Sequence, residues 1–190
     1  MRTEWLLLAV VVAVAIYLIA IYNRLVRQRN LVREGWSGID VQLKRRTDLV
    51  PNLVAVVKAY AAHERSLFEQ VAATRTSSIA ADTVASQAAA ERALQGALGR
   101  LLAVAETYPD LKANTNFLEL QQQLAEIEDH LQMARRYYNG TVRNLNISIQ
   151  SFPDVLVARP LGFREEQFFE LEDRSTEGVA PTVTFSEPAR

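Results

Sequence analysis

The sequence predicts an all-α protein, with an amino-terminal transmembrane helix followed by an elongated antiparallel bundle of three to four helices. Three observations predict this fold. Helix-favouring residues dominate, and Gly and Pro are scarce before residue 150. An uncharged apolar run opens the chain, and apolar residues then recur in steps of three and four. The 190 residues suit one domain plus an anchor.

Residues 5–23 are predicted to cross a membrane, with residues 1–4 forming a short extracytoplasmic end. The eighteen residues from Trp5 to Tyr22 carry no charge, and roughly 20 apolar residues span a bilayer as a helix. A cleaved signal peptide is less favoured, because the run is long and its small pair, Ala13 and Ala15, lies in the middle.

Flanking charge predicts the orientation of this span. Ahead of it, Arg2 is offset by Glu4. Four arginines follow it: Arg24, Arg27, Arg29 and Arg33. The positive-inside rule therefore places the amino terminus outside and the bundle in the cytoplasm, and the opposite arrangement ranks second. The same four arginines are candidate contacts for the headgroups of anionic lipids.

The bundle domain is predicted over residues 24–152, and its first helix over residues 24–76. A heptad seam of apolar residues runs through this helix, with polar interruptions at Arg46 and Glu64. Pro51 removes a backbone donor, yet the apolar phase passes through it unshifted. A helix kinked near Pro51 is therefore preferred to a chain reversal, and a helix split at that point is the alternative.

Two further helices are predicted over residues 82–107 and 114–151. Asp82 is the expected amino-terminal cap of the first. The second carries an unbroken seam that crosses Asn139-Gly140, a dipeptide that otherwise signals a hairpin turn. Gly140 costs about 1 kcal/mol relative to Ala inside a helix, so we expect a close helix contact there.

Beyond Phe152 the character of the chain changes. Residues 153–173 are expected to pack on the bundle, first as an extended run over residues 155–163 and then as one or two helical turns from Arg164. Residues 174–190 are typical of a mobile tail.

The sequence contains no recognisable catalytic or metal-binding constellation. It has no cysteine, which excludes thiol catalysis and cysteine-bound zinc. His63 and His130 lack the spaced partners of a zinc helix or a di-iron bundle, and Ile127 stands where the latter needs glutamate. Charge is balanced, with 21 Lys and Arg against 22 Asp and Glu, which argues against nucleic-acid binding. We therefore expect no enzyme activity, no cofactor and no bound metal.

Polar residues gather on the first and third predicted helices, and we expect them to form an interhelical network. A buried polar side chain can fix helix register at some cost in stability. A recognition surface for a partner or for lipid headgroups is the alternative. The candidate residues are Arg45, Arg46, Asp48, Asn52, Arg135, Tyr138, Asn139 and Asn146.

Three stretches of the chain resemble the LemA family of bacterial membrane proteins. They are VQLKRRTDLVPNLV at 41–54, ANTNFLELQQQLAEIEDHLQMARRYYNGTVRNLN at 113–146 and FPDVLVA at 152–158. The resemblance implies a single-pass protein of the bacterial cell membrane with its amino terminus outside and a largely four-helix antiparallel bundle. It implies no established catalytic residue and no settled activity.

The leading functional prediction is a non-enzymatic, membrane-anchored helical scaffold. Its expected partners are the lipid bilayer and unidentified proteins or further copies of itself. This prediction depends on an anchor joined to a heptad bundle that lacks a catalytic cluster. The alternative is a membrane-organising or envelope-stress protein that acts by self-association and lipid contact, motivated by the basic residues after the span.

Overall fold

The computed structural model describes residues 2–170, and this part of the chain is folded into helices with no strand. The all-α prediction is confirmed for these residues. The long helices are α1 (Arg2–Tyr60), α2 (Arg65–Ala80), α3 (Val84–Ala105) and α5 (Thr115–Gln150), and the short ones are α4 (Pro109–Lys112) and α6 (Val155–Ala158). The tail expected over residues 174–190 lies outside the described residues, as do residues 171–173.

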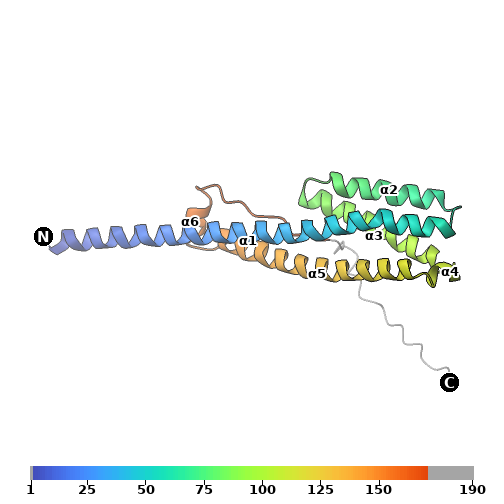
Figure 1. Ribbon diagram of the computed structural model, residues 1–190. Coiled ribbons are helices and arrows are strands. Elements are labelled where there is room, and N and C mark those ends of the chain that lie inside the picture. Colours follow the sequence, from blue (N-terminus) through green and yellow to red (C-terminus); the bar gives the residue numbers. More distant parts are fainter. Residues whose placement is uncertain (1, 171–190) are drawn as a thin grey trace, which may run out of the picture.

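Figure 1 shows an elongated molecule built on α1. Helix α5 runs beside α1 in the opposite direction, and the hairpin of α2 and α3 covers the half of α1 that lies farther from the amino terminus. The bundle is therefore two helices thick near the amino-terminal span and four helices thick at its far end.

Burial divides α1 into two parts. From Arg2 to Ala20 every side chain is exposed, although nearly all of them are apolar. Among the described residues, α1 is the one helix long and apolar enough to cross a membrane. From Ile21 onward the buried side chains recur at helical spacing. They include Leu25, Val32, Ile39, Leu43, Arg46, Val50, Leu53 and Val57.

Helix α1 continues through Pro51, so the helix is not split at that residue. Proline has no N–H and leaves the carbonyl of Thr47 without its helical donor. Arg75 of α2 supplies a donor instead, because its Nε donates to that carbonyl at 2.7 Å. The kink at Pro51 stays a prediction.

Replacing Arg75 with methionine is expected to lower the free energy of unfolding by about 1–2 kcal/mol, because the Thr47 carbonyl loses its donor. In a Pro51→Ala background the helix supplies the missing N–H, so the same replacement is expected to cost less. Urea unfolding of the four variants in a double-mutant cycle measures this coupling. Equal costs in both backgrounds would contradict the role assigned to Arg75.

The single helix expected over residues 24–76 is two helices in the structure. Helix α1 ends at Tyr60, the chain reverses, and α2 begins at Arg65. Neither Gly nor Pro marks this reversal, and apolar residues keep heptad spacing on both sides of it. The reversal lets Phe68 and Val71 join the apolar core at the far end of the bundle, where an uninterrupted rod would leave them in water.

Thr83, and not Asp82, caps α3. The backbone N–H of Ser86 donates to Oγ1 of Thr83 at 3.1 Å, and the backbone N–H of Thr83 donates to Oγ of Ser86 at 3.0 Å. These reciprocal bonds satisfy two donors at the start of the helix, which explains why the helix begins one residue later than Asp82 would set it.

The close helix contact expected at Gly140 is found at Gly35 instead. A Cβ atom at Gly140 would meet nothing within 4 Å. A Cβ atom at Gly35 would lie 3.0 Å from Cα of Tyr138 and 3.3 Å from Cδ1 of Tyr137. The absent side chain of Gly35 therefore lets α5 approach α1 at Tyr138.

A Gly35→Ala variant is expected to lose about 1–2 kcal/mol of unfolding free energy, because the helical backbone at Tyr138 cannot yield without separating α1 and α5. Gly140→Ala is the matched control and is expected to gain up to about 1 kcal/mol from helix propensity. Thermal unfolding beside the wild-type protein measures both shifts. A stabilised Gly35→Ala variant would show that the contact relaxes freely.

The core consists of two clusters of buried apolar side chains. One cluster lies between α1, α5 and the chain after α5, with Ala88 from α3, and the other joins α1, α2, α3, α4 and the start of α5. Along α1 the first cluster reaches Leu43 and the second begins at Val50. Arg46 lies between them.

Candidate functional site

A buried polar layer crosses the bundle between the two clusters. Arg46 is 2% exposed, and its Nη1 donates to Oε2 of the fully buried Glu91 at 3.0 Å. Its Nη2 forms an ion pair with Glu128. Oε1 of Glu91 also accepts hydrogen bonds from Oγ of Ser78 and, at 3.2 Å, from Nε2 of Gln87. These five residues, from α1, α2, α3 and α5, are called the Arg46 layer below.

Pairing makes the burial of these charges tolerable. An isolated ion in a protein interior is strongly destabilising, and a buried pair persists when further hydrogen bonds satisfy it. Apolar seams alone could slide by one heptad, whereas the Arg46 layer is complete in one register only. Arg46 and Glu91 are opposite charges at seam positions of the two helices, and this was the signal by which the sequence could have paired them.

Burial raises the pKa of the Glu128 carboxyl above its ordinary 4.5, Arg46 opposes this shift in part, and Glu91 adds to it. Between the pKa of Glu128 in the unfolded chain and its higher pKa in the folded protein, the folded protein binds more protons than the unfolded chain. Ionisation of Glu128 therefore lowers the free energy of unfolding as pH rises through that window.

A Glu128→Gln variant tests this pH dependence. The free energy of unfolding of the wild type minus that of Glu128→Gln is expected to fall as pH rises from 4.5. Chemical unfolding of both proteins at a series of pH values measures it, and a rising difference would contradict the assignment.

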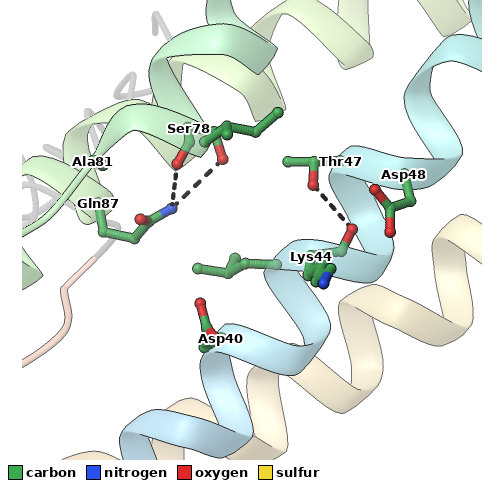
Figure 2. A pocket seen from close by; sticks show the side chains of 9 residues that line it. Asp40, Lys44, Thr47, Asp48, Ser78, Ala81 and Gln87 are labelled. Carbon is green, nitrogen blue, oxygen red and sulfur yellow. Dashed lines mark hydrogen bonds between the residues drawn. The ribbon is translucent and has the colours of Figure 1, made fainter.

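A pocket opens beside the Arg46 layer, between α1 and the connection from α2 to α3 (Figure 2). Asp40, Lys44 and Asp48 line it from α1, while Ser78 and Gln87 face them from the hairpin. The amide of Gln87 donates to the backbone carbonyl of Ser78 at 3.3 Å. Across residues 2–170 no group of three side chains is placed to hold a metal ion. Leu43, Ile79 and Ala81 complete the lining, so the pocket offers charged, polar and apolar contacts.

Residues 163–170 form no regular secondary structure and are held on α5 by two asparagine side chains. Nδ2 of Asn139 donates to the carbonyl of Phe169 at 3.2 Å, and the N–H of Phe169 donates back to Oδ1 at 2.9 Å. Asn146 makes the same pair of bonds with Glu166, both at 2.9 Å. The two asparagines are called the asparagine clamp below.

The spacing of the clamp shows that the bound segment is extended. Asn139 and Asn146 are seven residues apart, which is about 10.5 Å along a helix. Glu166 and Phe169 are three residues apart, and three residues of extended chain span about 10 Å. The two distances agree, so the bound segment is extended between Glu166 and Phe169. It runs antiparallel to α5, because the earlier asparagine binds the later residue of the segment.

Within the described residues, this conformation corrects part of the prediction for residues 153–173. Helical turns were expected from Arg164, and instead the helix in this region is α6, within the run expected to be extended. The reason lies on α5, whose side chains bond to the backbone groups that a helix would pair internally. Besides the clamp, the hydroxyl of Tyr138 donates to the carbonyl of Gln167 at 2.8 Å. Burial, with a smaller contribution from Glu166, raises the pKa of Tyr138 to about 12, so this hydroxyl stays protonated at neutral pH.

Two phenylalanines anchor the ends of the segment. Phe169 is fully buried and meets Trp36 edge to face, with 5.7 Å between ring centroids. Phe163 lies 6.0 Å from the ring centroid of Tyr22, and the guanidinium of Arg29 lies 5.1 Å from the centroid of Phe163. The surface of α1 and α5 that holds residues 163–170 is called the α5 groove below.

The eight residues predicted as one interhelical network lie at three places. Arg46 belongs to the Arg46 layer. Those along the α5 groove are Arg135, Tyr138, Asn139 and Asn146. Those exposed at an open pocket between α1 and α5 are Arg45, Asp48 and Asn52. A shared role for all eight stays a prediction.

The four arginines predicted to contact lipid headgroups differ in their protein contacts. Arg24 forms an ion pair with Asp154, and Arg29 lies over the phenylalanine ring described above. Arg27 and Arg33 are exposed. Lipid contact by these side chains stays a prediction.

Comparison with known proteins identifies the family of the chain. A model of the LemA family matches residues 35–185, which is most of the sequence. The chain belongs to the LemA family. The resemblance carried by the three sequence stretches is thereby confirmed.

Relatives of this LemA-family chain include magnetosome proteins. It is 27% identical over 200 residues to magnetosome proteins MamQ 2 and MamQ 1 of Paramagnetospirillum magneticum, covering 92% of this chain and 72% of each relative. It is 25% identical over 189 residues to magnetosome protein MamQ of Magnetospirillum gryphiswaldense, covering 86% of this chain and 68% of that relative. Family membership and the exposed apolar part of α1 support a membrane-associated protein of the LemA type.

Proposed function

We propose that this protein is a non-enzymatic scaffold of the bacterial cell membrane. Residues 5–23 anchor it, the bundle lies in the cytoplasm, and the α5 groove captures an extended segment of a protein partner. The observation that carries the proposal is the asparagine clamp, whose four hydrogen bonds all go to backbone groups. Backbone groups are common to every sequence, so the groove accepts any extended chain whose side chains fit its two ends.

The present occupant of the groove supports the proposal in two ways. Residues 163–170 are an example of the ligand that fits, an extended chain with aromatic side chains six positions apart. They also set a threshold for any partner, because a tethered segment competes at an effective concentration on the order of 1 mM. Capture is therefore expected of partners that bind strongly or are concentrated on the same membrane.

Photo-crosslinking in intact cells tests this function. A benzophenone amino acid in place of Tyr137, which is exposed and precedes Tyr138 of the groove in the chain, is expected to give specific protein adducts. These adducts are expected to vanish in Asn139→Ala/Asn146→Ala and to persist in Asn144→Ala, which changes an exposed asparagine of the same helix.

Two results of that experiment would count against capture of other proteins. Adducts with further copies of this chain alone would make the protein its own partner. Adducts that persist in Asn139→Ala/Asn146→Ala would contradict the α5 groove as the capture site. The absence of any specific adduct, under conditions in which a known scaffold is crosslinked to its partner, would contradict it as well.

A membrane-organising role through self-association and lipid contact is the second candidate, and the exposed Arg27 and Arg33 favour it. Both lie within about three helical turns of the apolar run. In vesicles that contain phosphatidylglycerol, energy transfer between labelled copies is expected to exceed that in neutral vesicles. Arg27→Gln/Arg33→Gln is expected to remove the excess, and equal transfer in both lipids for the wild-type protein would reject this role.

A further inference from the structure

Large apolar side chains are exposed around α6, outside the amino-terminal span. Within residues 21–170, Phe152 at 80% and Leu156 at 64% are the most exposed large apolar side chains, and Leu161 is 56% exposed. A single exposed leucine on a protein surface needs no explanation. Three large apolar side chains within ten residues, at one end of an elongated molecule, indicate a surface that contacts something else.

This region is fastened to α1 at the point where the exposed apolar part of α1 ends. Asp154 forms its ion pair with Arg24, and Phe163 packs on Tyr22. Val157 belongs to the same apolar cluster as Ile21. Figure 1 places α6 beside α1 at the end of the bundle nearest the amino terminus.

Helix length places this region relative to a bilayer. The apolar run from Trp5 to Tyr22 measures about 27 Å as a helix, whereas the hydrocarbon core of a bilayer is about 30 Å thick. The core therefore reaches Tyr22, and a headgroup layer of roughly 5 Å or more extends to about Arg27. Because Arg24 and Tyr22 are the contacts of the α6 region, that region lies within the headgroup layer.

We infer that residues 152–162, called the foot below, form a second membrane contact that inserts Phe152, Leu156 and Leu161 into the interface of the bilayer spanned by α1. The occupant of this patch is lipid because the region that carries it is joined to Arg24 and Tyr22, where the exposed apolar part of α1 ends. The charge within the foot agrees with this choice, since Arg159 is exposed between Leu156 and Leu161 and a cation at this depth is attracted to anionic headgroups.

Two attachments instead of one have a mechanical consequence. A single helix in a bilayer is free to tilt and rotate within its packing, whereas the foot fixes both the tilt of α1 and its rotation about its axis. Phe163 lies directly after the foot, so the α5 groove begins at the membrane surface. A chain captured there would lie close to the headgroups.

Spin labelling measures this contact directly, because a chain without cysteine accepts single labels. Nitroxides are placed by Phe152→Cys, Leu156→Cys and Leu161→Cys in nanodiscs that hold one copy each. Met133→Cys is the control, since Met133 is 55% exposed and lies about 27 Å along α5 from the foot. The three substituted side chains of the foot are exposed, so packing is preserved, which circular dichroism checks.

The expected result is a severalfold higher ratio of oxygen to aqueous nickel-chelate collisions at the foot than at the control position. Foot labels that match the control in this ratio would overturn the inference. Foot labels shielded from both reagents would overturn it as well, because they would assign the patch to a protein contact. The inference rests on the proposed anchor, but no partner protein takes part in this experiment, so its outcome is independent of capture by the α5 groove.

Discussion

An Arg46→Met variant is expected to lose about 3–5 kcal/mol of unfolding free energy, the usual result of removing one partner of a buried ion pair. Methionine fills most of the arginine volume, so the loss comes from charge and not from a cavity. Glu91 would keep its hydrogen bonds from Ser78 and Gln87, but its carboxylate would lie in an apolar interior without a cation. Chemical unfolding followed by far-ultraviolet circular dichroism measures the loss.

Arg45→Met is the matched control for this experiment, because Arg45 is exposed and adjacent on the same helix. Its effect is expected to stay within about 0.5 kcal/mol. Arg46→Met/Glu91→Met is expected to recover part of the loss, since apolar replacement of a buried pair is often neutral or stabilising, while Glu128 still lacks its cation. A loss below about 1 kcal/mol in Arg46→Met, as is typical of an exposed pair, would show that water reaches the Arg46 layer.

The helical core could be predicted from sequence because heptad spacing is a local property. The seam of the third predicted helix places Leu131, Tyr138 and Leu145 inward, and all three are buried. Each assignment concerns residues within two helical turns, so the period alone decides it. The same reasoning finds Arg46, because a charge in an apolar seam stands out.

Features that depend on distant parts of the chain could not be predicted in this way. Gly35 and Gly140 are both glycines inside a helical pattern, and only the crossing of α1 and α5 decides which one meets a neighbour. The reversal after Tyr60 could not be predicted either, because the apolar residues of α1 and α2 continue the same heptad spacing. Arg75 compensates for Pro51 from another helix, and the spacing within either helix says nothing of that bond.

The α5 groove was visible in part. Asn139 and Asn146 stand seven residues apart on one helix face, and both were predicted to belong to a polar network. The backbone groups that they bind, at Glu166 and Phe169, could not be predicted from the sequence. A side chain that bonds to backbone groups can bind any residue type, so the bound residues carry no recognisable pattern. Phe163 and Phe169 were therefore missed as anchors.

Phe169→Ala is expected to release residues 163–170 from the α5 groove. Truncating a fully buried phenylalanine costs about 3–5 kcal/mol, and a segment beyond α6 can detach while α1 and α5 stay folded. Release exposes the bond after Arg164 to trypsin. When opening is faster than cleavage, cleavage there is expected to accelerate by about 100-fold or more, which mass spectrometry of a digestion time course measures. The emission of Trp36, whose ring lies 5.7 Å from that of Phe169, is expected to shift as well.

Phe168→Ala is the matched control, because the neighbouring ring is 40% exposed, and its effect on cleavage is expected to stay within about threefold. Equal acceleration by both variants would show that Phe169 is not a dominant anchor. Asn139→Ala adds a further test, since Asn139 and the pocket at Trp36 hold the same residue. Once Phe169 is truncated, the segment is already detached and Asn139 has little left to hold. The effect of the double variant on the free energy of release is therefore expected to be smaller than the sum of the effects of the two single variants. A partner that places an aromatic side chain at this point would then gain the pocket and the clamp together, which gives the α5 groove a preference in spite of its backbone contacts.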